Sequence, residues 1–357
     1  MLTSAEPQIE AIGHVPSLDG IRALSFFLVF LAHAGLNKII PGGLGVTVFF
    51  FLSGYLITTL LRQEEKIRHT ISLRGFYYRR FLRIFPPMYI TLGAAILLQH
   101  WALVPGSWNT TGLLAQALHF TNYALLSGRA QILEGTSIFW SLSVEEHFYF
   151  LYPLSLLLFF RLRGTGARPT FLWIAVTLVL VWRIFLIAVM HSPFERTYLS
   201  TDTRIDSILF GCILALRFNP LDKSLQPSTR IRALALTSSA LILLFSLVMR
   251  GMFFRETLRY TLQGLALMPI FFFSVREFRN VAFAWLNHPW LSYVGKISYA
   301  LYLVHLLMLQ TATRLFPHAH SFVIAILGLG LSLSYAVLLR IFIEKPLAKM
   351  RIRHQSI

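Results

Sequence analysis

Several features of common soluble enzymes are missing from this sequence. It has one cysteine, Cys212, which excludes an internal disulfide framework and any metal site built from several thiolates. Charged residues make up only 13% of its 357 residues, whereas soluble chains carry about 25%. The sequence contains no P-loop, no Gly-x-Ser-x-Gly elbow and no His-Glu-x-x-His motif. A soluble globular enzyme is therefore not expected, and neither is a bound metal or cofactor.

Apolar residues dominate what is present. They account for 56% of the chain, the mean hydropathy is +0.64, and 31 residues are phenylalanine. The formal net charge is +17, from 32 basic and 15 acidic residues. In so apolar a chain, an excess of basic residues is typical of the cytoplasmic loops of a membrane protein, not of a nucleic-acid-binding surface. The first 16 residues are polar and lack a basic segment, so no cleavable signal peptide is expected.

Ten segments are long and apolar enough to cross a bilayer as helices, which takes about 20 residues each. They lie at about 18–36, 44–62, 82–101, 144–161, 170–190, 203–218, 231–250, 257–275, 297–315 and 321–343. The sequence therefore predicts an all-α polytopic membrane protein with about ten transmembrane helices. It also predicts one membrane domain over 1–357, with no soluble domain appended to it.

The basic residues divide unevenly between the two sets of connecting segments. One set holds 21 of the 32 and the other holds eight, while three lie in or near the helices. The positive-inside rule places the richer set, and with it both termini, in the cytoplasm. The longest connection, about 102–143, then lies outside, and its aromatic residues favour an ordered lid or an acceptor site.

The first predicted helix carries Asp19, Arg22 and His33. Charged groups at bilayer depth are costly and usually face a cavity or a partner. In a regular α-helix, Arg22 and His33 would lie within about 20° of the same face, and Asp19 can pair with Arg22. A neutral imidazole at this depth can act as a general base toward a hydroxyl group. In the alternative interpretation, Arg22 reaches lipid headgroups and His33 packs between helices.

Three arginines precede or enter the third predicted helix. Arg79 and Arg83 are four residues apart, and Arg80 and Arg83 are three apart. On a helix, all three can converge on one anionic ligand such as a phosphate. They could instead bind anionic lipid headgroups. Arg83 fits that alternative less well, because it enters the apolar run.

The fourth predicted helix begins near two adjacent carboxylates. Ser143 as N-cap and Glu146 three residues later form a capping-box pattern, which leaves Glu145 to hold a base or a basic partner. Ser53, in the second helix, has no base next to it in the sequence. A covalent route through this serine therefore has little support.

Polar residues also lie in the sixth and last helices. Arg204 and Asp206 are two residues apart and cannot face each other on a helix, so each is expected to meet another helix. Glu344 is expected to pair with a cytoplasmic arginine, and Pro346 is expected to end the last helix.

A polar stripe follows the ninth predicted helix. Ser298, Tyr302 and His305 repeat at helical spacing, which favours an interhelical hydrogen-bond seam. Should His33 not be the base, His305 and Glu145 are the next candidates.

These residues belong to seven short motifs that run in order from residue 18 to residue 346. The motifs are Leu18-Asp19-Gly20-Ile21-Arg22 with His33, Gly45-Val46 with Leu52-Ser53-Gly54-Tyr55, Arg80-Phe81-Leu82-Arg83, Trp140-Ser141-Leu142-Ser143-Val144-Glu145-Glu146, Thr203-Arg204-Ile205-Asp206, Ser298-Tyr299-Ala300-Leu301-Tyr302 with His305, and Glu344-Lys345-Pro346. In this combination the chain resembles the acyltransferase 3 family of integral membrane acyltransferases.

The resemblance implies transfer of an acyl group, commonly acetyl, from cytoplasmic acyl-CoA to a glycan or other acceptor across the membrane. The family's arginine/histidine motif carries over to Arg22 and His33, and its paired arginines to Arg80 and Arg83. We expect His33 to deprotonate the acceptor hydroxyl and Arg80 and Arg83 to hold the CoA phosphates. Arg22 would guide the pantetheine end or support charge near the thioester. Direct transfer and an acyl-histidine intermediate both fit.

The predicted site has catalytic, donor-binding and supporting members. The catalytic members are His33, Arg22 and Glu145, the acyl-CoA-binding members are Arg80, Arg83 and Arg79, and the supporting members are Asp19, Ser53, Arg204, Asp206, Tyr302, His305 and Glu344. The expected partners are acyl-CoA, most simply acetyl-CoA, a glycan or lipid-linked sugar acceptor, and the lipid bilayer of a bacterial inner membrane. The rival hypothesis is a transporter or flippase of an anionic lipid-linked sugar that uses the same buried arginines.

Overall fold

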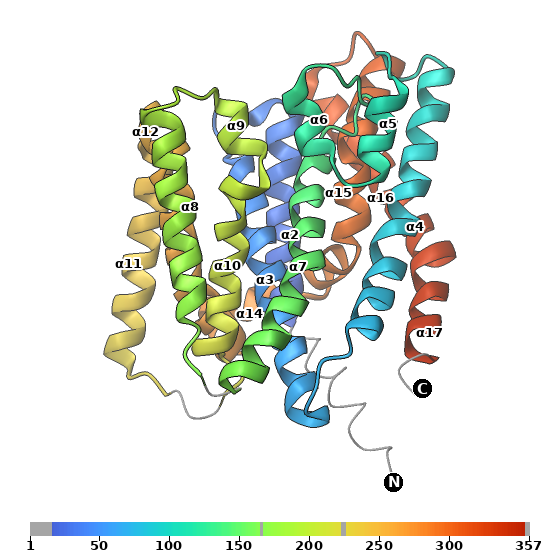
Figure 1. Cartoon of the computed structure of the whole chain (residues 1–357). Coiled ribbons are helices and arrows are strands. Elements are labelled where there is room, and N and C mark those ends of the chain that lie inside the picture. Colours follow the sequence, from blue (N-terminus) through green and yellow to red (C-terminus); the bar gives the residue numbers. More distant parts are fainter. Residues whose placement is uncertain (1–15, 165–166, 223–225, 354–357) are drawn as a thin grey trace. The chain divides into compact units, whose positions relative to one another are not determined.

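The computed structural model describes residues 16–164, 167–222 and 226–353. Throughout these ranges the secondary structure is helical and includes no strand (Figure 1). The chain divides into two compact units. Of the described residues, unit 1 comprises 16–25, 43–71, 144–164, 167–222 and 226–295, and unit 2 comprises 26–42, 72–143 and 296–353. Helices α2 (Pro16–Leu31), α7 (Phe139–Arg163) and α15 (Pro289–Leu315) run from one unit into the other. The single domain expected from the sequence stays a prediction.

Unit 1 is organised around α10 (Thr201–Arg217), which is buried along most of its length. This helix packs against α8 (Thr170–Ala188) and α13 (Leu258–Arg276), and α13 packs against α11 (Thr229–Val248). Because α10 is enclosed by protein, its polar side chains can be satisfied by neighbouring helices instead of facing lipid. The remaining elements of unit 1 are α3 (Gly42–Arg68), α9 (Phe194–Leu199), α12 (Met252–Glu256), α14 (Val281–Ala284) and η2 (Trp285–Asn287).

Helices α3 and α10 approach each other closely at two glycines. A Cβ atom at Gly54 would lie 2.0 Å from the main-chain oxygen of Ile208, and one at Gly211 would lie 2.0 Å from that of Phe51. Small residues allow helix backbones to come together in this way inside membranes. The contact fixes the position of Ser53, which directly precedes the first of these glycines.

Unit 2 contains the other long helices. In it, α4 (Leu73–His100) packs against α17 (Lys345–Arg353), and α16 (Ser321–Leu339) packs against the π-helical turn η1 (Ala32–Leu36). The shorter elements are α5 (Thr110–Ala117), α6 (Thr121–Ser127) and the π-helical turn η3 (Arg340–Glu344).

The long connection between α4 and α7 is folded in unit 2. Asn109 caps α5, because its side-chain oxygen accepts a hydrogen bond from the Gly112 N–H at 2.8 Å. Gln116 is fully buried and donates to the hydroxyl of Thr136 at 2.5 Å. The segment thus contains two short helices held by side-chain hydrogen bonds, and its role as an ordered lid or acceptor site stays a prediction.

Eight helical segments are long and apolar enough to cross a membrane. They are Ser17–Leu36, Gly42–Arg68, Leu73–His100, Thr170–Ala188, Thr229–Val248, Leu258–Arg276, Pro289–Leu315 and Ser321–Met350. The other two predicted spans are helices as well, but α7 carries Glu145 and Glu146 in its second turn and α10 has only 17 residues. The polytopic membrane fold is confirmed, and the count of ten spans and the side of the termini stay predictions.

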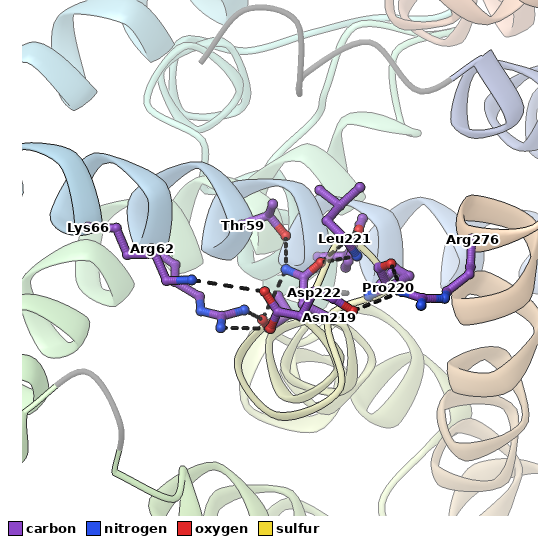
Figure 2. A network of polar contacts seen from close by, with 10 residues as sticks. Thr59, Arg62, Lys66, Asn219, Pro220, Leu221, Asp222 and Arg276 are labelled. Carbon is purple, nitrogen blue, oxygen red and sulfur yellow. Dashed lines mark hydrogen bonds and ion pairs between the residues drawn. The ribbon is translucent and has the colours of Figure 1, made fainter. Parts of the chain in front are cut away.

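A polar network holds one end of unit 1, where α10 leads toward α11 (Figure 2). Arg62 donates to the Asp222 carboxylate at 2.7 Å, and Lys66 Nζ lies 3.9 Å from the second carboxylate oxygen. Arg276 donates to the main-chain oxygen of Asp222 at 2.8 Å. Arg62, Lys66 and Arg276 all belong to the richer set of 21 basic residues, which the positive-inside rule places on one side of the membrane. The network brings them to the same end of this unit. Which side that end faces stays a prediction.

Two local expectations are wrong. Helix α7 begins at Phe139, so Ser143 lies inside the helix and donates to the Phe139 carbonyl at 3.2 Å instead of capping the N-terminus. Pro346 does not end a helix either, because it is the second residue of α17. Proline is tolerated there because the helix passes through the π-helical turn η3 directly before it, where the Lys345 N–H bonds to the Arg340 carbonyl.

Candidate active site

The first polar site lies in unit 2, where the α-helix of α2 ends at Leu31. The following π-helical turn holds His33 as its second residue and Gly35 in a left-handed conformation, with φ of 103°. Such turns are rare and frequently occur at functional sites. His33 is exposed, and its Nδ1 atom lies 3.0 Å from the main-chain oxygen of Val29. The prediction that Arg22 and His33 share one helix face assumed a regular α-helix between them. That assumption fails after Leu31, where the π-helical turn begins.

A second histidine lies behind the first. The His305 Nε2 atom is 3.2 Å from His33 Nδ1, and the two ring centroids are 5.1 Å apart. The His305 Nδ1 atom is 2.8 Å from the main-chain oxygen of Tyr302. His305 is 0% exposed, and the Phe26 and Phe30 rings lie 6.0 and 6.4 Å from its own. An exposed imidazole is thus backed by a fully enclosed one.

The polar stripe of α15 that holds His305 makes a second interhelical contact in unit 2. The Tyr302 hydroxyl lies 2.7 Å from the Ser141 hydroxyl at the start of α7. Tyr302 and His305 therefore confirm the predicted interhelical seam. The sequence pattern did not identify either Ser141 or His33 as their partners, because they lie on other helices.

The three arginines of α4 are all helical, as their predicted convergence requires. Helix α4 starts at Leu73, whereas the predicted span starts at about residue 82. Ser72 caps the helix, because its hydroxyl oxygen accepts a hydrogen bond from the Gly75 N–H. Arg79 and Arg80 are half-buried, and the Arg80 guanidinium lies 5.7 Å from the centre of the Phe76 ring. Arg83 is exposed. Their convergence on an anionic ligand stays a prediction.

In unit 1, Asp19 and Arg22 form the predicted pair, with 3.1 Å between Oδ1 and Nη1. Both side chains are largely buried. A Cβ atom at Gly295 would lie 2.0 Å from the main-chain oxygen of Asp19, so the start of α15 approaches α2 at this turn. The pair therefore lies in a tightly packed part of the helix.

Ser53, Tyr149 and Glu145 form a hydroxyl–carboxylate cluster in unit 1. The Tyr149 hydroxyl donates to Glu145 Oε2 at 2.9 Å, and Ser53 Oγ lies 3.4 Å from the same oxygen. The Ser53 and Tyr149 hydroxyls also hydrogen-bond to each other. Ser53 thus has a carboxylate nearby after all, supplied by a residue 92 positions away. Tyr149 was not among the predicted site residues, although its spacing of one helical turn from Glu145 could have indicated it.

Arg204 and Asp206 meet different helices, as predicted. Asp206 accepts a hydrogen bond from Arg183 on α8 at 2.7 Å, and all three residues are 0% exposed. Arg204 donates to the Thr47 hydroxyl on α3 at 3.2 Å, and its guanidinium lies 3.9 Å from the centre of the Tyr260 ring. Arg183 was not predicted, although a lone charge in the apolar run of α8 could have indicated a buried partner.

These contacts define two kinds of chemistry. The His33–His305 pair offers an imidazole that can take a proton from a hydroxyl group. The Ser53–Tyr149–Glu145 cluster offers hydroxyl groups beside a carboxylate. Within the described residues there is no group of three or more His, Cys, Asp or Glu side chains placed to hold a metal ion. Glu344 ends η3, and its expected pairing with an arginine stays a prediction.

Three known proteins that are similar to this chain are all named as O-acetyltransferases. A candidate O-acetyltransferase of Staphylococcus aureus (strain COL) is 25% identical over 95% of this chain and 58% of its own length. The peptidoglycan O-acetyltransferase OatA of Listeria monocytogenes is 27% identical over 94% of this chain and 56% of its own length. The O-acetyltransferase OatA of Staphylococcus aureus (strain NCTC 8325) is 29% identical over 58% of this chain and 35% of its own length. The matches thus cover between 35% and 58% of the length of these relatives, and no solved structure matches this chain.

The family model of an acyltransferase domain matches residues 15–341. That range is nearly the whole chain and holds every predicted site residue except Glu344. The chain therefore belongs to the acyltransferase 3 family.

Proposed function

We propose that this protein transfers an acetyl group from acetyl-CoA in the cytoplasm to a hydroxyl group of a glycan on the other side of the membrane. Family membership supports the reaction class. The names of its relatives support O-acetylation, and the name of the Listeria relative supports a peptidoglycan-like acceptor. A bacterial inner membrane is the matching location, since that membrane separates cytoplasmic acetyl-CoA from the cell wall.

The observation that carries the proposal is the exposed His33, held in a π-helical turn against a buried histidine. In the proposed step, His33 Nε2 takes the proton of the acceptor hydroxyl as its oxygen attacks the thioester carbonyl. The tetrahedral intermediate then collapses with cleavage of the carbon–sulfur bond. CoA leaves as a thiolate and receives the proton from His33, so that the products are an O-acetyl ester and CoA thiol.

The donor would be held by the arginines of α4. Arg83 is exposed and one helical turn from both Arg79 and Arg80, which suits a ligand that carries several phosphates. Arg22, paired with Asp19, would guide the pantetheine arm or support charge at the thioester. Both assignments are proposals based on side-chain type and helical placement.

Three chemical routes are consistent with the proposed reaction. The acceptor can attack the thioester directly, or an acyl-histidine can form first on His33. A third route through Ser53 gains support from the Glu145 carboxylate, which lies 3.4 Å from its hydroxyl. We favour the direct route because it requires only one exposed base.

Purified protein in liposomes tests the proposed function. Acetyl-CoA is supplied on one side and soluble peptidoglycan fragments on the other, and CoA thiol and acetylated fragments are measured. Acceptor-dependent CoA release with an acetylated product supports the enzyme. Movement of a lipid-linked sugar with no CoA release would instead support the rival transporter or flippase.

The sidedness of the proposal has its own test in intact cells. Cysteines introduced as Lys66→Cys and Gly128→Cys, with Cys212 replaced, are probed with a membrane-impermeant maleimide. We expect labelling at position 128 and not at position 66, since the positive-inside rule places 62–80 in the cytoplasm. The reverse pattern would overturn the proposed orientation.

A further inference from the structure

We infer that His305 is a positioning residue that fixes the tautomer and orientation of His33, through a chain of hydrogen bonds from the Tyr302 carbonyl to His305 and on to His33. This inference rests on the proposed role of His33 as a general base. It assigns to His305 a function that is neither substrate contact nor simple helix packing.

The direction of the chain follows from its first acceptor. A main-chain carbonyl oxygen can only accept a hydrogen bond, so the 2.8 Å contact with Tyr302 requires the proton of neutral His305 to reside on Nδ1. The Nε2 atom of His305 then carries a lone pair. That lone pair is directed at His33, whose Nδ1 lies 3.2 Å away.

The protonation of His33 follows in turn. Its Nδ1 atom faces two acceptors, the His305 lone pair at 3.2 Å and the Val29 carbonyl at 3.0 Å. Nδ1 must therefore carry the proton, which leaves Nε2 unprotonated. Because a neutral imidazole has one donor and one acceptor nitrogen, the partner of Nδ1 decides which nitrogen is basic. The chain of hydrogen bonds therefore leaves Nε2 as the basic nitrogen of His33.

The burial of His305 separates its role from that of His33. His305 is 0% exposed and has the rings of Phe26, Phe30 and Tyr302 around it, so it acts through His33 and does not touch a substrate. When His33 takes a proton on Nε2, its Nδ1–H becomes a stronger donor to the same two acceptors. The arrangement therefore also stabilises the imidazolium that forms during transfer.

The test compares His305→Leu with His305→Gln in purified protein. Leucine removes one of the two acceptors of His33 Nδ1 and leaves the Val29 carbonyl, so we expect kcat to fall about 10- to 100-fold with little change in the KM for acetyl-CoA, as for residues that orient metal-bound histidines. Glutamine can place its amide oxygen near the lost Nε2 atom and should restore part of kcat. Thr91→Val is the matched control, because it removes a buried hydroxyl that bonds to Tyr335 in the same unit without involving a histidine. It should lower the melting temperature but not kcat.

Two further measurements decide the interpretation. With ¹⁵N-labelled histidine, the NMR signals lost in His33→Asn identify His33, and we expect Nδ1–H in the wild type and a mixture of tautomers in His305→Leu. An Nε2–H tautomer in the wild type, or a kcat of His305→Leu within twofold of wild type, would overturn the positioning role. His305→Leu should also have no effect on the residual rate of His33→Asn. If His33→Asn itself transfers at the wild-type rate, the proposed base is wrong, which is a different failure from that of the histidine chain.

Discussion

Each unit contains a polar pair with at least one fully buried member, and the pairs differ in whether the second member is also enclosed. In unit 1, Arg183 and Asp206 are both 0% exposed and 2.7 Å apart. In unit 2, His305 is 0% exposed, while its partner His33 is exposed. A pair with both members enclosed holds helices together and presents no accessible reactive group. A pair with one member exposed holds a reactive group in place and leaves it accessible.

The difference in charge supports this division of roles. Arg183 is permanently cationic and must be compensated when buried, which the Asp206 carboxylate and the Thr261 hydroxyl accomplish together. A neutral histidine pair has no charge to compensate in the resting state. It can therefore accept a proton during a reaction without first breaking an ion pair.

The largest expected effect is on the enclosed pair. Asp206→Leu leaves the Arg183 guanidinium buried without its carboxylate, and the free energy of unfolding should fall by about 3–5 kcal/mol. Melting of the purified protein in detergent measures this loss. The double variant Arg183→Met/Asp206→Leu removes both charges and should recover most of the stability.

A second ion pair, between α9 and α10, is the matched control. Arg196 and Asp202 are 2.5 Å apart but keep 27% and 38% of their side chains exposed. Asp202→Asn should cost at most about 1 kcal/mol, since exposed pairs contribute little. If Asp202→Asn and Asp206→Leu lowered the free energy of unfolding equally, burial would not explain why the Arg183–Asp206 pair matters more for stability.

Arg83 is the exposed counterpart of Arg183 and extends the comparison to donor binding. Arg83→Ala should weaken CoA binding about 10- to 100-fold, because it removes hydrogen bonds to a charged ligand. Arg83→Lys should recover only part of the affinity, since lysine lacks the bidentate guanidinium. A thermal-shift titration with CoA measures the affinity. Arg79→Ala should matter less, because that side chain is half-buried; unchanged CoA affinity in Arg83→Ala would remove the phosphate role.

The smallest expected effect is at the hydroxyl–carboxylate cluster. In Ser53→Ala, Tyr149 still donates to Glu145 at 2.9 Å, so we expect a loss of about 1 kcal/mol in stability. Transfer should stay within about tenfold of the wild type, since the direct route does not use this hydroxyl. Complete loss of acetyl transfer by a folded Ser53→Ala protein would instead support a covalent route through Ser53.

Much of the fold could be predicted, because a long apolar run indicates a membrane helix without knowledge of the rest of the structure. Eight predicted spans correspond to long apolar helices, and the Asp19–Arg22 pair lies within one helical turn. The partners of buried groups could not be predicted, since they depend on packing between distant segments. His33 and His305 are 272 residues apart, and no local pattern relates them.

Some errors came from assuming regular helices. The π-helical turn at Ala32–Leu36 changes the rotation before His33, and hydropathy does not report it. Helix α7 starts earlier than its apolar run, because its first turns are buried among other protein segments and tolerate polar residues. Arg183 was the missed residue with the clearest signal, as the only charge in α8.

Acetyl transfer by purified His33→Asn, measured in detergent beside its melting temperature, tests the central claim most directly. Asparagine keeps hydrogen bonding but cannot accept the proton, so transfer should fall by about 10²–10⁴-fold. Because His33 is exposed, the melting temperature should stay close to that of the wild type. Near-wild-type transfer by the folded variant would contradict the account and move the search for the base to Glu145.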